Sequence, residues 1–298
     1  MQRRIFIKNM AISAVAVSAF GFVRFDGNSY TGDCETTSDI LGPFYQPNSP
    51  KRNNLLIPGE NGHKLELSGI IKHQDCITPY KNARIELWHC DSNGIYDNTT
   101  DDFRYRGTTY SGENGQYSFK TILPVPYDVG NGQIRPAHFH LMITAKGYQP
   151  LITQLYFSGD EHIASDSSAS SPTAKRRILE IQGKGDNSSK VLYDVSMSPK
   201  LLVEPAALEK ITGTYEHPID KNKKLTLFEN DQSLWMKNEV FGVSFLYVGN
   251  NTFEYPGSSD GFERNLQFET LPSGVVQLTL NYTDDDEVTH QEVYKKVQ

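Results

Sequence analysis

The sequence predicts an all-β protein that consists of an antiparallel β-sandwich followed by a smaller β-barrel-like domain. Many short runs alternate apolar and polar residues, and turn residues such as Asn-Gly separate them. No long stretch has the periodicity of an amphipathic helix. The length of 298 residues allows two domains, and the composition, with 37 % hydrophobic residues, is that of a globular chain.

The predicted sandwich begins near residue 65. Five runs with strand-like alternation are expected to be its strands: residues 65–70, 83–88, 115–120, 138–143 and 153–157. Residues 163–174, which are rich in Ser and Ala, and residues 183–189 have the composition of loops. Residues 191–197 are expected to form the closing strand.

A second domain is predicted from about residue 202, where the pattern of strands changes. The runs 225–228 and 234–236 flank a polar turn and predict a hairpin. Further strands are expected at residues 245–248, 252–255, 265–269, 275–280 and 287–295. The predicted domain boundaries are therefore 27–200 for the sandwich and 201–298 for the accessory domain. The Gly213-Thr214-Tyr215 run is similar to the start of the small barrel appended to serine β-lactamase-like proteins, which implies an accessory role.

Residues 1–26 are expected to be an export signal. Arg3 and Arg4 precede an uncharged run over residues 10–23, and these 14 residues are too few to span a bilayer core of about 30 Å. The pattern resembles a twin-arginine signal, which implies a periplasmic or extracellular protein with no stable membrane insertion after cleavage. An ordinary secretory signal or an uncleaved anchor are the alternatives.

The charge and the cysteines exclude several classes of protein. The 29 basic and 36 acidic residues give a net charge of −7, so no basic surface is expected for a nucleic-acid partner. Cys34, Cys76 and Cys90 are an odd number, and none lies in a Cys-x-x-Cys pair. One disulfide with one free thiol fits this count, but the pairing stays open.

His138 and His140 are the first candidates for metal ligands. Side chains two residues apart on a strand lie on the same face, so both imidazoles can reach one metal. Pro136 cannot donate to a strand ladder and therefore predicts that the strand begins at the histidines. A cupin is excluded, because residues 143–145 contain no Glu.

The remaining ligands of such a metal can be of several kinds. A ferrous site would need a carboxylate such as Asp128 or Asp160. A copper or zinc site would need more histidines, for which four are available at no regular spacing: His63, His73, His89 and His162. Tyr96 follows a Gly turn and Tyr127 ends a Pro-rich segment. Two phenolates with two imidazoles are a hard, anionic set that suits ferric iron.

Several motifs in order along the chain identify it as similar to one family. They are the Trp88 to Tyr96 run, Tyr105-Arg106-Gly107, residues 115–127, Arg135 to His140, Gln154 to Asp160, and, upstream, Gly42-Pro43-Phe44-Tyr45 and Arg52. This series resembles the intradiol ring-cleavage dioxygenases, which include the protocatechuate and catechol enzymes. The resemblance covers about residues 34–160.

The resemblance implies a mononuclear, non-haem Fe(III) cofactor and two substrates, a small aromatic diol and dioxygen. Tyr96, Tyr127, His138 and His140 would be the metal ligands. The candidate catalytic residues are then Arg135 and Gln154, next to the substrate ring, and Tyr127, which leaves the metal and acts as a base when the substrate binds. The implied reaction is intradiol cleavage of a catechol-type aromatic to a cis,cis-muconate-type product.

Three departures from the family leave the substrate and the oligomeric state open. The chain lacks the helical N-terminal dimerisation segment of the catechol enzymes, has Val129 where the protocatechuate enzymes carry a bulky aromatic, and offers no clear arginine for a substrate carboxylate. A homo-oligomer is compatible with these features. The alternatives are a copper or zinc sandwich enzyme of the dismutase type, and a metal-free exported sandwich that binds glycans or proteins.

Overall fold

The structure, a computed structural model, describes residues 16–18, 21–25, 30–33, 36–130, 132–185, 188–230, 233–237, 243–256, 264–284 and 288–297. The chain forms two compact units, residues 1–35 and residues 36–298. In the first unit β1 (Ala16–Ser18), β2 (Gly21–Phe25) and β3 (Tyr30–Asp33) form an antiparallel sheet, which the expected signal over residues 1–26 did not anticipate. Most of that signal lies outside the described residues.

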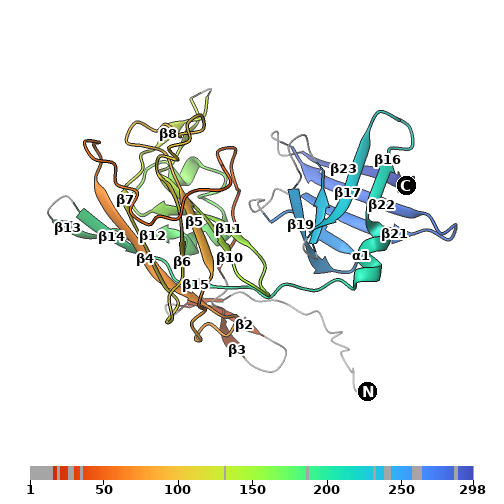
Figure 1. Cartoon of the computed structure of the whole chain (residues 1–298), viewed down its shortest axis with the longest axis horizontal. Coiled ribbons are helices and arrows are strands. Elements are labelled where there is room, and N and C mark those ends of the chain that lie inside the picture. Colours follow the sequence, from red (N-terminus) through yellow and green to blue (C-terminus); the bar gives the residue numbers. More distant parts are fainter. Residues whose placement is uncertain are drawn as a thin grey trace, which may run out of the picture. The chain divides into compact units, whose positions relative to one another are not determined.

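The first part of the larger unit contains two five-stranded sheets (Figure 1). One sheet has the order β12 (Ile178–Leu179), β11 (Leu151–Phe157), β10 (His138–Thr144), β5 (Arg84–Trp88) and β6 (Arg106–Tyr110). The other has the order β13 (Gln182–Gly185), β14 (Ser188–Leu192), β4 (Lys64–Lys72) and β15 (Val195–Ser196), with β7 (Gln116–Ile122) also paired to β4.

The two sheets share one hydrophobic core, so they pack face to face as a sandwich. Leu67 on β4 and Phe119 on β7 are fully buried, as are Ile85 on β5 and Leu141 on β10, and all four belong to one cluster. Because side chains alternate between the two faces of a strand, the apolar positions of each run line this core. The predicted sandwich is confirmed.

Most expected strands are present, but three details differ from the expectation. Strand β6 was missed, because its Arg-Gly-Thr-Thr-Tyr sequence does not alternate. The expected loop over residues 183–189 was wrong, since β13 and β14 form an antiparallel pair there. The sandwich is not purely antiparallel either, because β12 pairs in parallel with β11, and β14 and β15 pair in parallel with β4.

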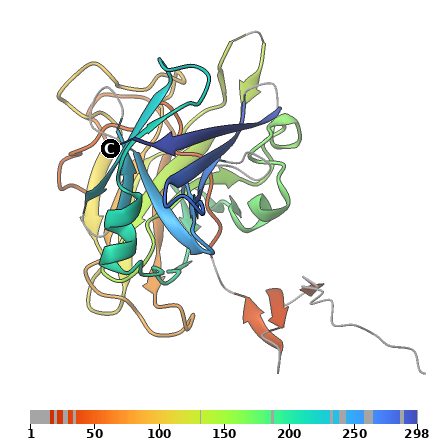
Figure 2. The same cartoon turned by 90° about the vertical axis from the view of Figure 1, so that its right-hand side faces the viewer.

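The C-terminal strands form a closed eight-stranded barrel after the short helix α1 (Pro205–Ile211). Its strands are β16 (Gly213–Glu216), β17 (Lys224–Asn230), β18 (Ser233–Met236), β19 (Val243–Gly249), β20 (Thr252–Glu254), β21 (Arg264–Thr270), β22 (Val276–Thr283) and β23 (Thr289–Lys296). Figure 2 shows them in cyan to blue, with α1 in teal. Tyr215, Phe245 and Phe268 fill its interior. The barrel-like prediction is confirmed, whereas the boundaries at residues 26 and 200 and the β-lactamase-like resemblance stay predictions.

Two connections of the sandwich carry short elements that bear on the site. The hairpin of β8 (Tyr127–Asp128) and β9 (Ile134–Arg135) precedes β10, and the turns η1 (Ile163–Ser165) and η2 (Pro172–Arg176) lie between β11 and β12.

Across the described part of the chain, no helix is long and apolar enough to cross a membrane. Cys76 is disulfide-bonded and Cys90 is a buried free thiol.

Candidate metal centre

His138 and His140 lie at the start of the central strand β10, as their spacing predicted. Strand β10 runs between β5 and β11, and His140 is opposite Trp88 on one side and Gln154 on the other. Both imidazoles are only 1 % exposed, and their ring centroids are 4.9 Å apart. The strand begins directly after Arg135-Pro136-Ala137. The two histidines therefore share a face at the end of the sheet.

A single hydrogen bond determines which nitrogen of His138 faces the site. The Nδ1 atom is 2.6 Å from the carbonyl oxygen of Pro136. Since a carbonyl only accepts, Nδ1 must carry the proton, and Nε2 of the neutral ring keeps its lone pair. Nε2 is 3.4 Å from the hydroxyl oxygens of both Tyr96 and Tyr127. This is the arrangement in which a histidine offers a nitrogen to a metal.

Tyr96 lies in a loop and Tyr127 begins the short strand β8, and their rings lie beside those of His140 and His138, respectively. Their ring centroids are 5.6 Å apart, and Tyr96 is 8 % exposed. Gly94, two residues before Tyr96, has a φ of +79°, and a Cβ there would lie 2.8 Å from the Cβ of Tyr127. Glycine is needed at this position for both reasons, since it accepts the left-handed backbone and lets the loops approach. The two predicted tyrosines and two predicted histidines are thus brought together.

His140 has no hydrogen-bond partner among the described residues at either ring nitrogen, although both are buried. Its ring stacks on Trp88, with centroids 5.0 Å apart and planes 7° apart. On another side Gly42, at φ +73°, is so near that a Cβ would lie 2.8 Å from Cε1 of His140. An unpaired buried polar group is costly, so this orphaned imidazole indicates that a ligand completes the site.

Burial keeps all four groups uncharged when no cation is present. It lowers the pKa of His138 to about 3 and that of His140 well below its ordinary value, and the charge of Arg135 lowers both further. Burial likewise raises the pKa values of Tyr96 and Tyr127. A cation at the centre would instead lower the pKa values of the two tyrosines, because it stabilises the phenolate form.

These residues fit a ferric ion. The set joins two neutral imidazoles to two hydroxyls that can become anionic oxygens. Both histidines and Tyr96 are buried, and both ring nitrogens of His140 are without a hydrogen-bond partner among the described residues. Among the described residues, no group of three or more His, Cys, Asp or Glu is placed to hold a metal ion. The donors next to the two histidines are the hydroxyls of Tyr96 and Tyr127.

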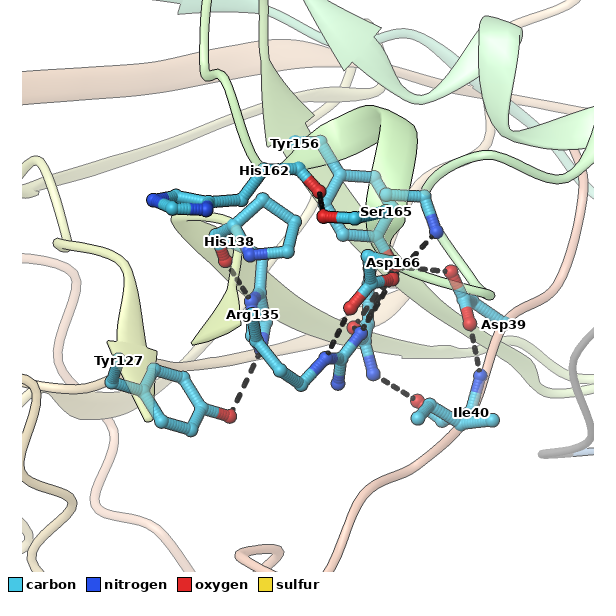
Figure 3. A network of polar contacts seen from close by, with 12 residues as sticks. Asp39, Ile40, Tyr127, Arg135, His138, Tyr156, His162, Ser165 and Asp166 are labelled. Atoms are coloured by element: carbon cyan, nitrogen blue, oxygen red, sulfur yellow. Dashed lines mark hydrogen bonds and ion pairs between the residues drawn. The ribbon is translucent and has the colours of Figure 1, made fainter. Parts of the chain in front are cut away.

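Arg135 and Gln154, the other predicted site residues, contact each other. Arg135 lies near His138 (Figure 3), and Gln154 is opposite His140 on the neighbouring strand. The Nη2 atom of Arg135 donates to Oε1 of Gln154 at 2.9 Å, and the Gln154 amide donates to the carbonyl of Ile40 at 2.9 Å. Arg135 is held by Asp166 through an ion pair of 2.8 Å. Its pKa is raised, because this pairing outweighs the effect of burial.

Several residues of the site were not singled out from the sequence. Asp39, Tyr156 and Asp166 are buried polar groups linked to Arg135 or Gln154. Phe44 stacks on Tyr96, with centroids 4.3 Å apart. The family motifs contained Tyr156 and Phe44, but Asp166 lies in the Ser- and Ala-rich stretch that was expected to be a plain loop, and the sequence carried no signal for it.

The carboxylates considered as metal ligands are engaged elsewhere. Oδ2 of Asp160 accepts a hydrogen bond of 2.8 Å from the backbone of Ala137, and Oδ1 of Asp128 accepts one of 2.7 Å from Gly130. Asp160 therefore anchors the start of β10 instead of binding a metal.

Three of the further histidines considered for a copper or zinc site also have other partners. His63, His73 and His89 hydrogen-bond to Ser189, Tyr148 and Thr121, respectively.

Comparison with known proteins agrees with this geometry. A family model described as Dioxygenase matches residues 40–199, which is more than half of the chain and includes all four candidate ligands. The chain belongs to the intradiol ring-cleavage dioxygenase family. The match to this dioxygenase family ends close to the last strand of the sandwich, β15, and leaves the barrel outside.

The chain is similar to several dioxygenases. It is 34 % identical over 174 residues to a chlorocatechol 1,2-dioxygenase of Rhodococcus opacus (51 % of this chain, 67 % of that protein). It is 30 % identical over 199 residues to a hydroxyquinol 1,2-dioxygenase of Nocardioides simplex (58 % and 67 %). The chain spans about half to two thirds of the length of the curated relatives that it matches.

A solved structure shows the same fold. The 3-chlorocatechol 1,2-dioxygenase of Rhodococcus opacus matches with a TM-score of 0.50 at 24 % identity, over 55 % of this chain and 73 % of that one.

Proposed function

We propose that this protein is an Fe(III)-dependent dioxygenase that opens the ring of a catechol-type substrate between its two hydroxyl-bearing carbons. The relatives carry the names chlorocatechol, hydroxyquinol and catechol 1,2-dioxygenase, which supports an ortho-diol as the substrate class. The implied product is a cis,cis-muconate-type diacid. The observation that carries the proposal is the convergence of two tyrosine hydroxyls on Nε2 of His138, beside the unpartnered ring of His140.

Tyr96, Tyr127, His138 and His140 would hold the iron. Bound there, ferric iron would supply a Lewis acid to which the deprotonated diol could chelate, which would make the ring reactive towards dioxygen. Trp88, stacked on His140, restricts that imidazole to one orientation. Pro136 does the same for His138 through the Nδ1 hydrogen bond.

Tyr127 is the ligand best suited to take part in proton transfer. It is partly exposed and begins the short strand β8, whereas Tyr96 is buried and stacked on Phe44. Its Oη can therefore move and hold a proton taken from a substrate hydroxyl, while Tyr96 stays fixed. Arg135 would stabilise negative charge on the substrate, because its guanidinium lies near His138 and keeps its charge.

The visible spectrum of the iron-loaded protein, before and after anaerobic addition of catechol, tests the proposal. We expect a phenolate-to-iron charge-transfer band that shifts when catechol binds. In Tyr127→Phe the band should change, because one phenolate is lost, whereas Tyr110→Phe, a substitution at an exposed tyrosine on β6, should leave it unchanged. A protein that stays colourless with ferric iron would contradict the assignment.

We also propose that the protein is exported by the twin-arginine route. Arg3 and Arg4 followed by the uncharged run over residues 10–23 support this. Replacing both arginines by lysine should keep the protein in the cytoplasm in a cell-fractionation assay. Export of the double variant at the wild-type level would contradict the twin-arginine route.

A further inference from the structure

The guanidinium of Arg135 is fixed on two of its three nitrogens. Nε donates to Oδ2 of Asp166 at 2.8 Å, and Nη2 donates to Oε1 of Gln154 at 2.9 Å. Within the described part of the chain, Nη1 has no hydrogen-bond partner. Figure 3 shows the guanidinium next to the carboxylate of Asp166. The contacts therefore leave one donor group of the arginine free for another molecule.

Asp166 is itself rigidly held. Its side chain is 4 % exposed, and Oδ1 accepts a hydrogen bond of 2.8 Å from the backbone of Ala169 while lying 3.3 Å from Nη2 of Arg135. The Asp166 carbonyl also accepts from the backbone of Ser170 at 2.9 Å. The turn between η1 and η2 thus fixes the carboxylate of Asp166, and the carboxylate in turn fixes the guanidinium of Arg135.

A second set of contacts holds the Nη2 atom of the guanidinium. Tyr156 donates its hydroxyl proton to Asp39 at 2.8 Å, so its oxygen remains an acceptor for Nη2 of Arg135 at 3.4 Å. The amide of Gln154 donates to the carbonyl of Ile40, which turns Oε1 towards the arginine. The arginine is therefore restrained by buried groups at both Nε and Nη2.

We infer that Asp166 is a positioning residue for the reaction, which aims the free Nη1 of Arg135 at the substrate. This inference rests on the proposed function, in which Arg135 stabilises charge on the bound diol. Asp166 pairs with the charged guanidinium and orients it. A donor that is held before the reaction needs no reorganisation when charge develops, and a displacement of about 1 Å can cost about a hundredfold in rate.

The coupling between the two residues can be measured on metal-free protein by NMR. We expect the Nε–H signal of Arg135, assigned by its loss in Arg135→Gln, to exchange slowly in the wild type and rapidly in Asp166→Asn. Ser165→Ala is the matched control, because Ser165 is the neighbouring residue on the same turn and its hydroxyl donates to the backbone carbonyl of His162, away from the arginine. That variant should keep the slow exchange. Slow exchange in Asp166→Asn would overturn the inference.

Kinetics of the iron-loaded protein test the consequence. Asp166→Asn should lower kcat/KM by about tenfold to a hundredfold, with iron content and the visible band of the resting protein unchanged. In an Arg135→Gln background the same substitution should change kcat/KM by less than about twofold, because its effect passes through the arginine. Losses that multiply independently in the double variant would overturn the inference.

A second variant covers the case in which Asp166→Asn does not fold. Asp166→Glu keeps the charge but moves the carboxylate by one methylene, so it should fold and still lower kcat/KM. Wild-type kcat/KM in Asp166→Glu, together with fast exchange of the Nε–H signal, would also overturn the inference. Failure of the proposed function would look different, since the wild type itself would then bind no iron or cleave no diol.

Discussion

The Nδ1 atom of His138 lies 2.6 Å from the carbonyl oxygen of Pro136, and this contact aims Nε2 at the hydroxyls of Tyr96 and Tyr127. The proline serves two purposes here. Its ring ends the preceding segment so that β10 begins at His138, and its carbonyl selects the imidazole tautomer. The histidine is consequently a prepared donor before any metal binds.

Binding of ferric iron near neutral pH should release protons from the tyrosines and none from the histidines. The pKa values of His138 and His140 are lowered, so both rings are already neutral, whereas those of Tyr96 and Tyr127 are raised. We expect about two protons per iron from the side chains, and an affinity that rises with pH. Calorimetry in buffers of different ionisation enthalpy measures this number, and Tyr127→Phe should release one fewer. Equal release by both proteins would contradict ligation by Tyr127.

Gly42→Ala should weaken iron binding by displacing His140. The new Cβ would lie 2.8 Å from Cε1 of His140, and the residue would have to keep a φ of +73°. We expect at least about a tenfold loss of iron affinity, measured by competition with a chelator. Gly59→Ala is the matched control, because Gly59 has a φ of +82° with nothing within 4 Å of its Cβ position. It should lose a similar amount of stability and bind iron normally. If Gly42→Ala binds iron as tightly as the control, the close approach of Gly42 to His140 is not needed for iron binding.

Asp39→Ala should destabilise the sandwich strongly. Asp39 is fully buried and ion-paired with Arg177, which is 1 % exposed. Removing one partner leaves an uncompensated buried charge, so we expect a loss of about 3–5 kcal/mol in the free energy of unfolding. Urea denaturation measures it. Lys81→Ala removes one side of an exposed pair with Glu113 and should cost less than about 1 kcal/mol. Similar losses for the two variants would show that burial of the first pair is unimportant.

His89 should make the metal-free protein less stable in acid. It is buried, with Nδ1 bonded to the carbonyl of Cys90 and Nε2 to the hydroxyl of Thr121, and burial lowers its pKa to about 4. An unfolded histidine titrates near pH 6.5, so the unfolded state binds more protons between about pH 6.5 and 4, and stability falls as pH falls through that window.

The His89→Gln variant tests this contribution. We expect its free energy of unfolding to change less between about pH 7 and about pH 5 than that of the wild type, by at most about 1.4 kcal/mol per pH unit. His138 and His140 contribute the same slope to both proteins, so the difference between them isolates His89. Identical pH dependence in wild type and variant would contradict the prediction.

The periodicity of the chain was sufficient for the fold class and for most strands. Alternating runs such as those that became β4, β7 and β10 specify which face is buried, because side-chain direction in a strand has a period of two. The pattern did not specify partners. The parallel pairing of β14 and β15 with β4, and the closure of β16 with β23 in the barrel, depend on contacts between distant segments.

The candidate ligands were predictable because their motifs carry local meaning. His138 and His140 are two apart on a strand, and Tyr96 and Tyr127 end turns built from Gly and Pro. What sequence alone determined is therefore the type of fold and a candidate donor set, together with the chemistry that this set would suit.

The tertiary structure decided how those donors are supported. Asp166 lies 31 residues from Arg135 and Asp39 lies 117 from Tyr156, and neither pair has any signature in local sequence. Buried polar groups need partners wherever the fold provides them, so these contacts arise only once the sheets and loops have packed. Among the described residues, the same packing leaves the ring of His140 without a hydrogen-bond partner and the Nη1 atom of Arg135 free. The proposed iron binding uses the first of these groups, and the proposed stabilisation of substrate charge uses the second.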